Sequence, residues 1–152
     1  LHDRLANIGA ELLARTIPQY VSGASQPRPQ PAEGATYAAK IKKQDGEIDW
    51  TQPARVIWNR IRALVPWPGA FTHLPGQPHP LLLKIWEAKP SDRSGEPGRV
   101  LQADKSGIVI GCGNGALIVS LLQREGGRRL TAAEFLAGHS LKVGEKVGAV
   151  GA

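Results

Sequence analysis

After residue 69 the chain becomes a series of short apolar runs, each closed by glycine, proline, asparagine or aspartate. Runs of this length between turn residues are typical of β-strands. Leu83 and Ile85 can face one side of a strand, as can Leu117, Val119 and Leu121. The pattern predicts five or six short strands in a small closed or nearly closed barrel. The expected strands lie within 70–74, 81–88, 98–104, 107–111 and 116–123.

Glycine turns are expected to join these strands. Asp104-Lys105-Ser106-Gly107 places glycine where a hairpin needs a left-handed residue, and Asn114-Gly115 fits a second hairpin. The second turn belongs to GCGNG, residues 111–115, which looks like a phosphate-binding loop. A dinucleotide-binding loop needs a helix directly after its glycines, whereas the strand-like ALIVSLLQ follows here. We therefore interpret GCGNG as a hairpin.

Two helices flank the predicted strands. The first is expected over 51–65, with Thr51 as its N-cap and Pro66 at its end. The second opens with the capping box T-x-x-E of residues 131–134 and continues as TAAEFLA. The sequence thus indicates a mainly β domain with flanking helices.

The first residues are organised differently. Leu5, Ile8 and Leu12 recur at helical spacing, and Pro18 is expected to end that helix. Prolines at 27, 29 and 31 then alternate with other residues, which is typical of an extended linker. Helix followed by linker favours the end of a larger preceding domain; the alternative is that the helix packs on the domain that follows. The expected organisation is a helix over 1–20, a linker over 21–36 and a folded domain over 37–152.

Composition excludes some classes of protein. Hydrophobic residues make up 41% of the chain and charged residues 21%, as in a soluble globular protein. No apolar run approaches the roughly 20 residues of a membrane-spanning helix. The single cysteine excludes a disulfide framework. We expect a cytoplasmic monomer without membrane contact.

Side chains that carry chemistry do not form a catalytic or metal centre in this sequence. The histidines at 2, 73, 79 and 139 lack the spacing of metal ligands, and none adjoins Cys112. We therefore expect no catalytic residue and no metal ligand in this chain.

Basic residues are the better candidates for a site. Lysine and arginine total 19 against 13 aspartate and glutamate, a net charge of +6, and the excess is spread along the chain. Such groups neutralise phosphates and give salt-sensitive affinity for nucleic acid; the competing interpretation is an ordinary solvated surface. The candidates are Lys40, Lys42, Lys43, Arg55, Arg60, Arg62, Arg128 and Arg129.

A family resemblance joins these features. ATYAAKIKKQDGEIDW, then A-x-x-I-x-N-x-I-R-A-L-x-P-W-P-G-A, resembles the C-terminal domain of methionyl-tRNA formyltransferases. LKIWEA and PGRVLQADKSGIVIGCGNGALIVSLLQREGGRRLTAAEFLAG continue the resemblance, which covers roughly residues 35–140. The opening helix resembles the last helix of that family's N-terminal domain, and the proline stretch resembles its interdomain linker.

The resemblance implies a function. Family members transfer a formyl group from 10-formyltetrahydrofolate to the amino group of methionine on initiator tRNA, for translation initiation. Their N-terminal Rossmann-like domain holds the folate and the catalytic Asn, His and Asp, and their C-terminal domain is an OB-fold-like barrel that helps to hold the tRNA. The expected partners are therefore initiator Met-tRNA and the chain's own N-terminal domain. No cofactor is expected in this chain, and the chain alone is expected to be inactive.

Two other functions fit the same residues. A related folate-dependent formyltransferase or hydrolase that does not act on tRNA shares a version of this domain. A structural buttress for a catalytic domain, without nucleic-acid contact, also remains open. Proline, tryptophan and proline at 66–68 look closer to the tRNA enzymes, and Trp67 is expected to pack where the helix meets the first strand.

Overall fold

The computed structural model describes residues 1–76 and 79–148. By its internal contacts the chain divides into two compact units, Leu1–Ala39 and Lys40–Ala152. Each unit is described below by itself.

The first unit holds one helix, α1 (His2–Val21), in which no residue is buried. Leu5, Ile8 and Leu12 are each about half exposed, so the predicted apolar stripe is present on the helix surface. The expected end at Pro18 is wrong, because α1 continues through the proline to Val21. Proline lacks an N–H, but the Pro18 carbonyl still accepts from the Ser22 N–H at 3.0 Å, so the turn that follows it closes. Within the described residues, no helix is long and apolar enough to cross a membrane.

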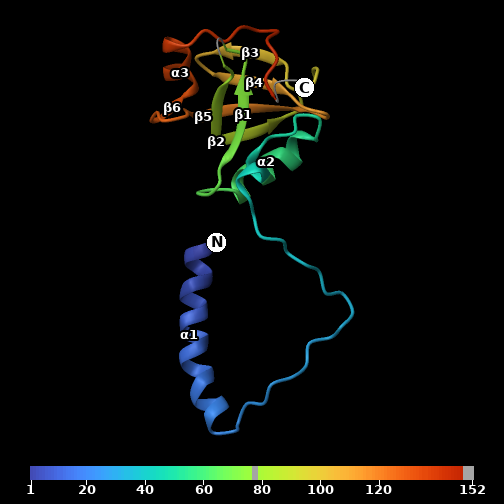
Figure 1. Ribbon diagram of the computed structural model, residues 1–152, viewed down its shortest axis with the longest axis vertical. Helices are drawn as coiled ribbons and strands as arrows, with labels where there is room; N and C mark the ends of the chain where they lie inside the picture. Colours follow the sequence, from blue (N-terminus) through green and yellow to red (C-terminus); the bar gives the residue numbers. More distant parts are fainter. Residues whose placement is uncertain (77–78, 149–152) are drawn as a thin grey trace. The chain divides into compact units, whose positions relative to one another are not determined.

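The second unit is a six-stranded antiparallel sheet with helices against it (Figure 1). The strands pair in the order β1-β2-β5-β4-β3, and β6 pairs with β5 as a branch. The predicted mainly β class with flanking helices is confirmed. Its elements are the 3₁₀ turn η1 (Lys43–Gly46), α2 (Ala54–Ala63), β1 (Ala70–Leu74), β2 (Leu81–Ser91), β3 (Val100–Asp104), β4 (Gly107–Gly111), β5 (Ala116–Arg124), β6 (Arg129–Thr131) and α3 (Ala132–Gly138).

The sheet itself is open between β3 and β1, so the barrel is not closed by strands. The segment 144–148 lies across this gap. On the β3 side the Val147 N–H donates to the Gly98 carbonyl at 2.8 Å. On the β1 side the Gly148 N–H donates to the His73 carbonyl at 3.0 Å. An irregular segment thus satisfies backbone groups that an edge strand would expose, and the fold is barrel-like.

The inner face of the sheet carries the hydrophobic core. Ile85, Leu117, Leu122 and Phe135 are completely buried there. Leu122 takes the inward place predicted for Leu121, because β5 has an irregularity of its own in the pairing with β2. Leu121 pairs with Glu87 and Val119 with Ala88, so β5 has one extra residue, Ser120, between these pairs. Its inward alternation therefore passes from Val119 to Leu122.

The start of α2 differs from the sequence prediction, whereas the start of α3 agrees with it. Helix α2 begins at Ala54 behind Pro53, so Thr51 is not its N-cap; the Thr51 hydroxyl instead donates to Asp49 at 2.6 Å. The helix ends at Ala63, before Pro66. The capping box of α3 is present as predicted. Both predicted hairpins are present as well, between β3 and β4 and between β4 and β5.

Candidate nucleic-acid interface

The outer face of the sheet carries a row of polar side chains across β2, β5 and β6. Lys84 pairs with Gln123, and Gln123 pairs in turn with Arg129. Paired residues of neighbouring antiparallel strands project to the same side. The register therefore gathers a lysine, a glutamine and an arginine from three strands on the face opposite the core.

Trp86 joins this row because it is the extra residue of the β2 bulge, lying between the paired Ile85 and Glu87. Its indole Nε1–H donates to Oε1 of Gln123 at 2.8 Å. The amide of Gln123 donates in turn to the Gly127 carbonyl at 2.6 Å. The bulge and these two bonds fix the orientation of the indole ring.

Two cations lie near the Trp86 ring. The guanidinium carbon of Arg129 lies over the ring, 3.8 Å from its centroid, and the Lys84 ammonium lies 5.8 Å from it. Cations over indole faces are attracted by the ring quadrupole. Lys84 Nζ also lies 3.4 Å from the Pro68 carbonyl. Lys84 and Lys43 line a neighbouring hollow of about 160 Å³, together with Phe71.

A second cluster of tryptophan and arginine lies on α2. The guanidinium carbons of Arg55 and Arg62 lie 4.7 and 3.7 Å from the Trp58 ring centroid. Arg62 also donates to the Asn59 side chain at 2.7 Å. Trp58 is partly buried and packs against the core, so this cluster covers a structural tryptophan. Both arginines are exposed to solvent.

The other predicted basic residues divide by their contacts. Arg60 donates to the Asp45 carbonyl at 2.9 and 2.6 Å, so it ties α2 to the turn η1. Arg128 forms an ion pair of 3.2 Å with Glu134 in the capping box of α3. Lys40, Lys42 and Lys43 are exposed just before and within η1. The structure thus brings Arg129 together with the sheet row and sets Arg55 and Arg62 on α2.

Sequence reasoning missed Lys84, Trp86 and Gln123. The alternation of β2 carries the signal for Lys84, because Leu83 and Ile85 point inward and the residue between them must point outward. The bulge at Trp86 and the pairing of β5 with β6 join strands that are far apart in sequence. No local pattern gives that register.

The expected packing of Trp67 is wrong. Its side chain is 60% exposed, in the bend between the end of α2 and β1. Gly69 has φ +78°, a left-handed conformation that turns the chain into β1. Its α-carbon approaches Trp86 so closely that an added β-carbon would lie 3.5 Å from the ring. The bend therefore brings Gly69 against Trp86 on the outer face of the sheet and leaves Trp67 exposed.

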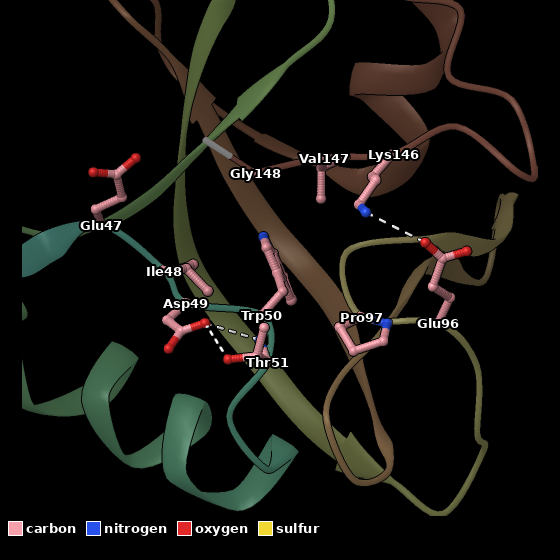
Figure 2. A pocket seen from close by; sticks show the side chains of 10 residues that line it. All are labelled: Glu47, Ile48, Asp49, Trp50, Thr51, Glu96, Pro97, Lys146, Val147 and Gly148. Atoms are coloured by element: carbon pink, nitrogen blue, oxygen red, sulfur yellow. Dashed lines mark hydrogen bonds and ion pairs between the residues drawn. The ribbon is translucent and has the colours of Figure 1, made fainter. Parts of the chain in front are cut away.

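A larger hollow, of about 640 Å³, lies elsewhere in this unit, and Figure 2 shows its lining. Its carboxylates are Glu47, Asp49 and Glu96, against one lysine, Lys146. Side-chain hydrogen bonds from Thr51 and Gln52 lower the pKa of Asp49, so this group is anionic at neutral pH. Such a lining repels phosphate, and the hollow does not fit an anionic partner.

The described parts of the chain offer neither a cluster of metal ligands nor a reactive thiol. No group of three or more histidine, cysteine, aspartate or glutamate residues is placed there to hold a metal. Burial raises the pKa of the Cys112 thiol to about 11. At neutral pH this thiol is therefore protonated and unreactive.

Comparison with known proteins agrees with this architecture. Residues 40–140 match the family described as formyl transferase, C-terminal domain. A protein of Parvibaculum lavamentivorans named methionyl-tRNA formyltransferase is 48% identical over 97% of this chain and 47% of its own length. A protein of Chromobacterium violaceum with the same name is 45% identical over 97% of this chain and 46% of its own length. The chain thus spans about half the length of the curated relatives it matches.

Solved structures share the fold at lower identity. A variant of HypX from Aquifex aeolicus superposes with a TM-score of 0.59 at 22% identity, over 87% of this chain and 24% of that one. HypX in complex with tetrahydrofolic acid superposes with a TM-score of 0.58 at 22% identity, over 90% of this chain and 26% of that one. The match over residues 40–140 establishes the family. The chain belongs to the family of formyl transferase C-terminal domains.

Proposed function

We propose that this chain is the tRNA-docking part of a methionyl-tRNA formyltransferase. That enzyme formylates the amino group of initiator Met-tRNA with 10-formyltetrahydrofolate and so serves translation initiation. The relatives that share 45–48% of their aligned residues with this chain carry that name. The observation that carries the docking role is the gathering of Lys84 and Arg129 around Trp86 on the outer face of the sheet.

Phosphate contacts account for the docking. A folded RNA presents closely spaced phosphates, and exposed lysine and arginine side chains bind them without reading sequence. The exposed groups that offer such contacts include the predicted Lys40, Lys42, Lys43, Arg55, Arg62 and Arg129. The partly buried Lys84 of the sheet row adds a further cation. Arg60 ties α2 to η1 and Arg128 pairs with Glu134 in the capping box of α3, so we assign both to the fold and leave them out of the docking surface.

A docking domain remote from the reaction makes physical sense. Formyl transfer to an amine needs a positioned donor, a deprotonated amine and stabilisation of an oxyanion. The tRNA is far larger than the reacting amine, so contacts made at a distance can position it and supply binding energy. We assign the folate site and the catalytic residues to an N-terminal Rossmann-like domain of the whole enzyme.

Helix α1 fits the same division of labour. Its apolar stripe includes Leu5, Ile8 and Leu12, and no residue of the helix is buried. An apolar stripe of this kind is typical of a helix that packs on a larger hydrophobic surface. We assign α1 to the end of the catalytic domain and residues 21–36 to an interdomain linker. For the whole enzyme we propose a monomer in the cytoplasm.

Salt dependence tests the proposal. Fluorescence anisotropy with labelled initiator tRNA is expected to show binding of the 152-residue chain at low salt, with affinity falling steeply toward moderate salt. No binding at low salt, or a flat salt response, would contradict docking. Either result would favour a formyltransferase that does not act on tRNA, or a buttress.

A charge-removal variant localises the docking surface. Replacing Lys40, Lys42 and Lys43 together by alanine is expected to lower the salt slope by about one for each phosphate that these lysines neutralise. The melting temperature should stay unchanged, because these side chains are exposed. A collapse in stability would instead make them structural residues.

A further inference from the structure

Arg129 is held in place by an aromatic ring and has no other partner in the described parts of the chain. Its guanidinium lies over Trp86, and no hydrogen bond or ion pair of this group occurs within residues 1–76 and 79–148. Arg129 is nevertheless exposed to solvent. One side of the guanidinium therefore covers the indole, and the other side is open to a ligand.

The support beneath Arg129 is rigid. Trp86 is fixed by its hydrogen bond to Gln123, which is fixed in turn by the Gly127 carbonyl. Gly127 precedes β6 by only two residues, so the same turn that anchors the glutamine also delivers Arg129. A preorganised side chain loses less entropy when a ligand binds to it.

The α2 cluster lacks this arrangement. Trp58 is flanked by Arg55 and Arg62 from its own helix, and Arg62 is also tied to Asn59. These arginines offer charge to a phosphate. They lack the support from neighbouring strands that holds Arg129.

We propose that Arg129, supported by Trp86, stacks on an unpaired base of the docked RNA, while Lys84 contacts an adjacent phosphate. This inference rests on the proposed RNA-docking function and adds the kind of nucleotide that the outer face binds. Arginine planes stack on unpaired bases, and every base offers such a face. A blunt duplex keeps its bases stacked inside and can use only the charge of Arg129. Trp86 and Gln123 are positioning residues.

A pair of arginine-to-lysine variants separates stacking from charge, because lysine keeps the charge and lacks the plane. The variants are Arg129→Lys and, as a matched control one residue earlier, Arg128→Lys. The probes are a single-stranded RNA oligonucleotide and a blunt RNA duplex with the same number of phosphates. Arg129→Lys is expected to weaken binding of the single strand roughly five- to twentyfold, with the salt slope unchanged. Duplex binding by Arg129→Lys, and both affinities of Arg128→Lys, should stay within about twofold of the starting protein.

Two replacements of the supporting ring complete the test. Trp86→Ala is expected to lose the same discrimination in favour of the single strand. Trp86→Phe keeps an aromatic face and should restore most of it, which a merely structural defect would not show. Equal losses for strand and duplex in Arg129→Lys, or no loss in Trp86→Ala, would overturn the stacking proposal. If the starting protein binds neither probe at low salt, the docking function itself fails.

Discussion

Neighbouring residues of β2 serve different purposes on the two faces of the sheet. Ile85 is completely buried and packs with Leu122 in the core. Trp86, the next residue, lies on the outer face beneath Arg129. The core around Ile85 consists mainly of apolar side chains that need no particular partner atoms. The outer face holds its tryptophan by a specific hydrogen bond and a cation.

This difference between the two faces indicates which substitutions change stability and which change RNA binding. Removing inner side chains leaves cavities that the surrounding structure cannot refill, so stability is lost. Removing outer side chains exposes little new surface and mainly alters what the domain can bind. Substitutions on the two faces should therefore move stability and RNA affinity independently.

The largest effect on stability is expected from the inner face. Ile85→Ala should lower the free energy of unfolding by about 2–5 kcal/mol, since the side chain is completely buried. Urea denaturation measures this loss, and RNA affinity of the fraction that stays folded should be unchanged. A loss under about 1 kcal/mol would mean that the core tolerates a cavity here and would break the comparison.

Trp86→Ala should have an intermediate effect on stability. We expect a loss of about 1–2 kcal/mol in the free energy of unfolding, because the ring is only partly buried. The same denaturation experiment checks it, with Ile85→Ala as the reference. A loss as large as that of Ile85→Ala would assign Trp86 to the core and remove the distinction between the faces.

Trp67→Ala should change stability less. Because the side chain is 60% exposed, we expect a loss under about 1 kcal/mol. Thermal and urea unfolding of the variant measure it. Reduced tRNA affinity at nearly unchanged stability would add Trp67 to the outer-face site, whereas a loss of several kcal/mol would restore the packing role expected from sequence.

The smallest effect concerns acid stability next to β6. Hydrogen bonds from the Thr131 backbone N–H and hydroxyl, with a smaller contribution from Arg128, lower the pKa of Glu134. Since the folded pKa lies below the ordinary value of 4.5, this stabilisation is present above that pH and is lost as pH falls through the folded pKa. Glu134→Gln should flatten the decline of the melting temperature below about pH 4.5. An unchanged decline would mean that the ionised Glu134 carboxylate does not contribute to stability at higher pH.

Much of the fold could be predicted from local patterns. Turn and cap chemistry within a few residues determines the hairpins at Gly107 and Gly115 and the capping box of α3. These features can therefore be predicted from sequence. The end of α1 and the start of α2 differ from the prediction because the prolines do not mark these ends: Pro18 lies inside the last turn of α1, and Pro53 directly precedes the first residue of α2. The closure by residues 144–148 carries no strand pattern and could not be foreseen.

The part of the candidate site that depends on local helical spacing could also be predicted from sequence. Arg55 and Arg62 stand three residues before and four after Trp58, so helical spacing alone brings them to that ring. Trp86, Gln123 and Arg129 meet only through the bulge in β2 and the pairing of β5 with β6. The register between strands that are distant in sequence decides which cations share a surface. A single sequence does not reveal this register.

The indole N–H signals of the four tryptophans test the central claim most directly. They can be assigned by single tryptophan-to-phenylalanine variants and followed by ¹H–¹⁵N NMR while unlabelled initiator tRNA is added at low salt. The outer-face account predicts that the Trp86 signal shifts or broadens first. The Trp50 signal should stay in place, because that indole is buried and bonded to Thr72 at 3.0 Å. Movement of the Trp50 signal beside an unmoved Trp86 signal would contradict the account and place the RNA on another surface.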